Sequence, residues 1–128
     1  MLKKILYISI FLLFSFAAQN STTEKFEEAV VSQDYDKISD LCDSFVEVET
    51  VKTDKVTSKR QVGTVIREFF ATYPIKSFRY IHRGTSPGGA QYAIGTYVSA
   101  QDKRFRVVIK MKTVNEQLVL ESIKFSPE

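Results

Sequence analysis

His82 is the only side chain in this sequence whose unperturbed pKa lies near neutral pH, which makes it the natural candidate for acid–base chemistry. It follows two aromatic residues at a spacing of two, as neighbours on one face of a strand do. Strict alternation predicts two faces: Phe78, Tyr80 and His82 on one, and Arg79, Ile81 and Arg83 on the other. Tyr92, on the next predicted strand, completes a set of candidate pocket residues with Phe78, Tyr80 and His82.

A catalytic base needs a partner within hydrogen-bond reach, and the predicted strand of His82 contains no acidic residue. Glu47 or Glu121 would have to converge on it from other strands. Two interpretations remain open: a structural histidine hydrogen-bonded near Gly84, which is favoured, and a catalytic His82. The sequence therefore provides no confident catalytic residue.

The other reactive residue types lack the spacing that their chemistry requires. Cys42 follows an apolar pattern and lies between two aspartates, so a buried, unreactive thiol is expected. One cysteine and one histidine 40 positions apart do not form a zinc motif, and the acidic residues do not follow the pattern of a calcium loop. The glycines are typical of turns and bulges rather than of a phosphate-binding loop. No metal or cofactor is expected.

The first eighteen residues have the pattern of an export signal. Lys3 and Lys4 precede an apolar run from Ile5 to Ala18, and Ser15-Phe16-Ala17 fits the rule for signal peptidase. The run is shorter than the ~20 residues of a membrane-spanning helix, so we expect cleavage after Ala17 or Ala18 with no remaining membrane anchor. A domain covering residues 19–128 would then be released to the periplasm or outside the cell.

Charge is distributed unevenly in the expected mature chain. Residues 19–58 contain 10 acidic and 4 basic side chains, whereas residues 59–128 contain 5 acidic and 12 basic ones. Arg104, Arg106, Lys110 and Lys112 share one face of a predicted strand. This face is expected to be solvated or paired with the acidic half, and attraction of a polyanion is the alternative. A net charge near +1 without a stacking motif argues against nucleic acid.

Hydrophobic periodicity predicts an α+β domain with the order α-α-β-α-β-β-β-β. A helix that Thr22 or Thr23 caps precedes a short second helix that Asp34 caps, and a strand starts near Ser44. A capping box at Ser58 to Gln61 begins the strongest helix, which Pro74 ends. Four antiparallel strands follow at residues 75–83, 90–99, 104–112 and 117–125, with a bulge at Glu121-Ser122.

This order resembles the nuclear transport factor 2-like (cystatin-like) superfamily, in which a cone-shaped sheet packs on helices. A closer resemblance is to a family of small exported bacterial proteins classed as a domain of unknown function. It is carried by these residues: Phe69-Phe70, Pro74, Phe78, His82-x-Gly84, Gly89-Ala90-Gln91-Tyr92-Ala93-Ile94-Gly95-Thr96 and Phe105-Arg106-Val107. The resemblance implies the fold and export. It implies no reaction.

Three functions are compatible with these features. The first is a non-catalytic exported module that binds a small ligand or a protein. The second is a pocket enzyme of the hydrolase, isomerase or dehydratase kind that uses His82 with Tyr80 or Tyr92. The third is a subunit that pairs with another copy through its sheet face, as members of the superfamily often do.

Overall fold

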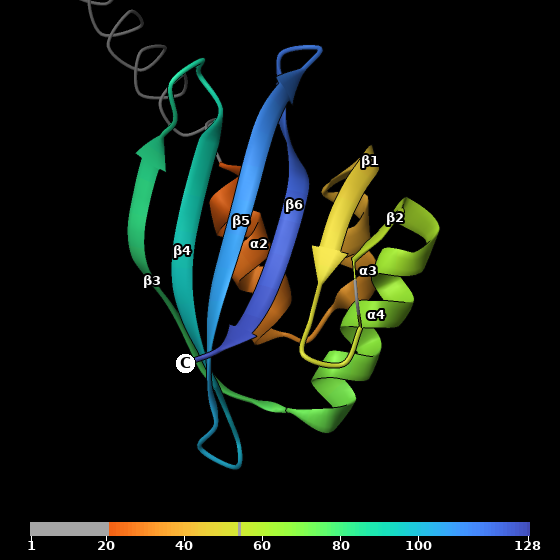
Figure 1. The fold of residues 1–128 in the computed structure, drawn as a ribbon, viewed down its shortest axis with the longest axis vertical. Helices are drawn as coiled ribbons and strands as arrows, with labels where there is room; N and C mark the ends of the chain where they lie inside the picture. Colours follow the sequence, from red (N-terminus) through yellow and green to blue (C-terminus); the bar gives the residue numbers. More distant parts are fainter. Residues whose placement is uncertain (1–20, 54) are drawn as a thin grey trace, which may run out of the picture.

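A computed structural model of the protein describes residues 21–53 and 55–128 (Figure 1). The predicted signal peptide lies outside these residues. The elements in chain order are α2 (Thr22–Val31), α3 (Tyr35–Asp40), β1 (Cys42–Glu49), β2 (Val56–Ser58), α4 (Lys59–Thr72), β3 (Ile75–Thr85), β4 (Gln91–Ser99), β5 (Arg104–Val114) and β6 (Gln117–Pro127). Among the described residues, no helix is both long and apolar enough to cross a membrane.

The strands form one sheet in the order β2-β1-β6-β5-β4-β3. The predicted antiparallel meander of the last four strands is confirmed. Strand β1 pairs in parallel with β6, and the short strand β2, which was not predicted, pairs with β1. Figure 1 shows α2, α3 and α4 on one side of the curved sheet, and no described helix covers the other side. We call the uncovered side the outer face.

The helix ends are partly those that the sequence predicts. Asp34 caps α3 by accepting a hydrogen bond from the Lys37 amide, as expected. Ser21 caps α2, so the expectation of Thr22 or Thr23 was wrong. Ser58 is the N-cap residue of α4, but its side chain makes no capping hydrogen bond, so the predicted capping box does not form. Helix α4 ends before Pro74, because proline cannot donate the next backbone hydrogen bond.

The core is centred on Phe69, near the end of α4. Its ring centroid lies 4.4 Å from that of Phe125, 5.1 Å from Phe105, 5.2 Å from Tyr97 and 5.3 Å from Tyr73. These partners come from α4's end and from strands β4, β5 and β6. Phe69 therefore joins the helix to three central strands and fills the space between them.

Three partly buried hydrogen bonds of Tyr97 and Gln33 fix the connection from the helices to β3. The Tyr97 hydroxyl donates to the backbone carbonyl of Tyr73. The Gln33 side chain donates to the Val30 carbonyl and accepts from the Ile75 amide at 3.1 Å. Burial is the main cause that raises the pKa of Tyr97 to about 12, so this hydroxyl stays a donor at physiological pH. The start of β3 is thereby held against the end of α2.

We predict that Phe69→Ala lowers the free energy of unfolding by about 3–5 kcal/mol, because truncation leaves a cavity among four aromatic rings. Urea denaturation followed by circular dichroism measures the change. Phe45→Ala is the matched control, since 81% of the Phe45 side chain is already exposed, and a change within about 0.5 kcal/mol is expected there. Similar losses in the two variants would contradict the assignment of Phe69 to the core.

Candidate functional site

A β-bulge in β3 changes which residues of this strand share a face. Tyr80 lies opposite Gly95 and His82 lies opposite Ile94, so Ile81 is an extra residue in the ladder. Because a shift of one residue moves every following side chain to the other face, strict alternation fails after Tyr80. The prediction that His82 shares a face with Phe78 and Tyr80, and that Arg83 opposes them, was therefore wrong.

Phe78, Tyr80 and Arg83 lie on the helix side of the sheet. Phe78 is buried, and its ring packs edge-on against Phe26 of α2. The Tyr80 hydroxyl donates to the Thr23 carbonyl at 2.6 Å, and the Arg83 guanidinium, which lies over the Tyr80 ring, donates to the Thr23 hydroxyl. Burial raises the pKa of Tyr80 well above its usual value. These contacts hold the start of α2 on β3.

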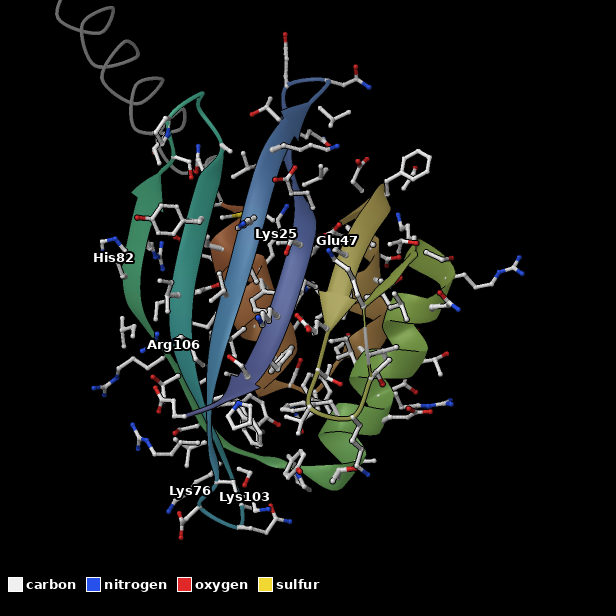
Figure 2. The ribbon with its side chains drawn as sticks, in the orientation of Figure 1. Lys25, Glu47, Lys76, His82, Lys103 and Arg106 are labelled. Carbon is white, nitrogen blue, oxygen red and sulfur yellow. The ribbon has the colours of Figure 1, made fainter. Side chains whose placement is uncertain are left out.

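His82 lies on the outer face, on the edge strand β3 (Figure 2), and its ring contacts that of Tyr92. The Tyr92 hydroxyl is 3.1 Å from Nε2 of His82 in an exposed hydrogen bond. The Tyr92 ring lies on Gly84, where an added Cβ would come within 2.5 Å of the Tyr92 hydroxyl oxygen. Of the four candidate residues, the structure brings His82 and Tyr92 together and separates them from Phe78 and Tyr80.

No carboxylate reaches His82 from the strands considered in the sequence. Glu47 is on β1 and Glu121 on β6, whereas His82 is on β3 at the opposite edge of the sheet. With strands about 4.8 Å apart, β1 is roughly 19 Å from β3 and β6 roughly 14 Å. Within the part of the chain that the structure describes, His82 makes no ion pair. This geometry favours the structural interpretation of His82.

Glycines of this region have two different roles. Gly88 and Gly89 have φ values of +96° and +91°, so they form the turn between β3 and β4, as predicted. Gly95 lies opposite the bulge, and a Cβ there would come within 2.8 Å of the Phe78 ring. Gly84 and Gly95 therefore make room for aromatic rings on opposite faces of the sheet, which the expectation of turns and bulges did not include.

A groove opens on the outer face where β1 leaves β6. From Cys42 to Glu47, β1 advances five residues while its partner on β6 advances two, from Leu120 to Ser122. The predicted bulge at Glu121 is confirmed, since Lys110 pairs with Ser122 and Met111 with Leu120. Two adjoining hollows of about 410 and 290 Å³ result. They share Glu47, Lys110 and Ser122.

Charges in this groove largely balance each other. Lys55 pairs with Glu47 at 3.2 Å, Lys124 with Glu49 at 3.5 Å and Lys112 with Asp43 at 2.8 Å. The hydrogen bond from Lys112 is the main cause that lowers the pKa of Asp43. Part of the basic strand face is thus paired with the acidic half of the chain, as expected. The rim carries Phe45, whose side chain is 81% exposed.

Cys42 is buried, as predicted, and its thiol donates to the Ile38 carbonyl. Burial raises the pKa of Cys42 to about 12, which keeps the unreactive thiol form at neutral pH. In residues 21–53 and 55–128, no three His, Cys, Asp or Glu side chains are grouped in a way that could hold a metal ion.

Comparisons with known proteins show what this chain is similar to. A family model described as "Domain of unknown function (DUF4783)" matches residues 23–126. A comparison with curated proteins found no match. Among solved structures, a DUF4783 family protein from Bacteroides uniformis matches with a TM-score of 0.72 and 19% identity over 82% of this chain and 95% of that one.

Two further structures extend the likeness of fold. A Nostoc punctiforme protein of unknown function with a cystatin-like fold gives a TM-score of 0.67 at 11% identity, over 84% of this chain and 86% of that one. A protein named "Rd1NTF2_04 with long sheet" gives 0.66 at 17% identity, over 82% and 96%. The predicted nuclear transport factor 2-like, cystatin-like fold is thus confirmed.

We predict that Gly84→Ala displaces the Tyr92 ring and breaks its hydrogen bond to His82. The His82 ring signals in a proton–nitrogen correlation spectrum should then move toward those of Tyr92→Phe, which removes the same bond. Stability should change little, because the partly exposed Tyr92 ring can turn away from the added methyl group. Gly63→Ala in α4, where the nearest atom is 3.9 Å from the added Cβ, is the control and should leave the His82 signals unchanged. Unchanged signals in Gly84→Ala would contradict the pairing.

Proposed function

The chain belongs to the family described as Domain of unknown function (DUF4783), and from this premise we propose that it is a non-catalytic binding module that acts after export. The observation that carries the proposal is the contrast between the two faces of the sheet. The helix side is filled by the aromatic residues around Phe69, whereas none of the helices that the structure describes lies over the outer face. A small ligand or a protein partner therefore binds on the outer face.

The groove beside β1 supports this placement. It has an exposed aromatic side chain at its rim and several charged groups within it, which is the composition of a surface that makes specific polar contacts. Pairing with a second copy through the same face is the alternative for the partner. Catalysis through His82 is disfavoured, because its exposed hydrogen bond goes to Tyr92 and the acidic candidates lie on distant strands.

Export follows from the basic and apolar pattern of the first eighteen residues. Cleavage after Ala17 or Ala18 leaves a short segment before Ser21, the N-cap of α2. The released domain is placed in the periplasm or outside the cell. Its one cysteine is buried, so its stability comes from packing rather than from an internal disulfide.

Export is tested by expressing the full chain in a bacterium with a general secretion pathway. We expect a processed protein that begins at Ala18 or Gln19, identified by N-terminal sequencing of the periplasmic and medium fractions. Leu12→Arg places a charge in the apolar run and should leave the precursor in the cytoplasm. Lys52→Arg is the control and should be processed normally. An unprocessed wild-type chain in the cytoplasm would contradict export.

The outer face is tested by a screen of small molecules and peptides on the exported protein, with amide chemical-shift mapping of each hit. We expect the perturbed amides to lie in β1, β4, β5 and β6, and binding to persist in His82→Ala. Hits that map to α2 and α4 would contradict the placement. A measurable turnover that His82→Ala abolishes would instead support the enzyme alternative.

A further inference from the structure

One half of the outer face is basic and contains no acidic residue in its strands. Strands β3, β4 and β5 hold no aspartate or glutamate. Three of their basic side chains are neutralised from elsewhere: Lys76 by Asp102, Arg104 by Glu128 and Lys112 by Asp43. Figure 2 places Lys76 at the end of the sheet, beside Lys103, away from the middle of this face.

Three other bases on this half make no ion pair with any residue in 21–53 or 55–128. They are Arg79, Arg106 and Lys110, and we call them the free bases. Thr96 pairs with Arg79 on one side and with Arg106 on the other. Ser126 lies opposite Arg106, and Ser122 lies opposite Lys110. Each free base thus has a hydroxyl beside it, and the two together can bind an oxyanion.

The spacing of the free bases on β5 is regular. Arg106, Val108 and Lys110 occupy alternate positions on the outer face, and Val108 pairs with Ile94 on β4. Both aliphatic residues are partly exposed. At about 3.3 Å per residue, the two bases are roughly 13 Å apart, with an apolar patch between them.

Arg106, Val108 and Lys110 of β5, together with Ile94 of β4, form what we call the basic strip. We propose that this strip binds an extended acidic segment of a protein partner, in which two carboxylates flank an apolar side chain. In an extended chain, side chains at alternate positions point the same way and have the same spacing as those of β5. Acidic residues four positions apart therefore reach Arg106 and Lys110, while the residue midway between them covers Val108 and Ile94. This inference rests on the proposed function and specifies the partner's chemistry.

The first experiment titrates the exported protein into a short fluorescent peptide and follows its anisotropy. The peptide carries glutamates two residues before and two residues after a central leucine. We expect Arg106→Gln and Lys110→Gln each to weaken binding about 2- to 5-fold, as exposed ion pairs do, and the double variant about 10-fold. Affinity should fall with added salt. Lys25→Gln, which removes the same charge from α2, is the control and should bind like the wild type.

A second peptide of the same composition, with its two glutamates adjacent, tests the spacing. Weaker binding of this peptide supports the inference, and equal binding overturns it in favour of charge attraction alone. Chemical-shift mapping of the backbone amides distinguishes failure of this inference from failure of the proposed function. Peptide signals confined to β1, or failure of the peptide while other ligands map to the outer face, overturn the inference and leave the binding module standing. Hits confined to the helices overturn both.

Self-association is the remaining outcome. Strand β1 itself presents an exposed Phe45 between Asp43 and Glu47, the same order of charges and apolar group as the peptide. Concentration-dependent dimerisation that Phe45→Ser abolishes would assign the strip to a second copy and overturn the partner segment. A monomer that binds the peptide supports it.

Discussion

The packing of Phe69 against the sheet is the contact on which the rest of this structure depends. One residue of α4 contacts aromatic rings from three strands that are consecutive in the chain and adjacent in the sheet. Because these rings fill the space under the sheet, the C-terminal end of α4 is fixed to β4, β5 and β6, and the polar groups of Tyr97 and Gln33 then fix where β3 starts. The same packing that stabilises the fold occupies the side on which a cone-shaped sheet would otherwise hold a ligand.

Much of this architecture follows from local sequence periodicity. Apolar residues at intervals of three and four from Val62 to Tyr73 predict α4, and alternation of apolar and polar residues after Pro74 predicts four strands. Both patterns arise because each element buries one face. The bulge at Glu121 was predictable since the apolar positions change parity there, from Leu118 and Leu120 to Ile123 and Phe125. When the buried apolar residues of a strand shift from even to odd positions, the sequence itself predicts a bulge at the shift.

The sequence around Ile81 shows no comparable shift of apolar positions, so it does not predict the bulge there. The residues around it are basic, aromatic or exposed, so either register places acceptable side chains on each face, and only the pairing of Tyr80 with Gly95 and His82 with Ile94 decides between them. The sequence therefore placed His82 on the wrong face: it lies with Tyr92 on the outer face and not with Phe78 and Tyr80. Strand β2 and the parallel pairing of β1 with β6 were also missed. They depend on contacts between distant parts of the chain, which periodicity does not report.

The outer face combines two surfaces of different chemistry, which meet at Lys110. Beside β1, acidic and basic side chains are already paired within the chain, so a ligand there competes with existing contacts that are exposed and individually weak. On β3 to β5, the free bases have hydroxyl neighbours but no described carboxylate partner, so an anionic group gains new contacts without breaking old ones. The uneven charge of the sequence is thus neutralised where its two halves meet at β1 and β6, and it persists on the strands farther away. This is why the basic strip, rather than the larger groove, is expected to select a partner by charge.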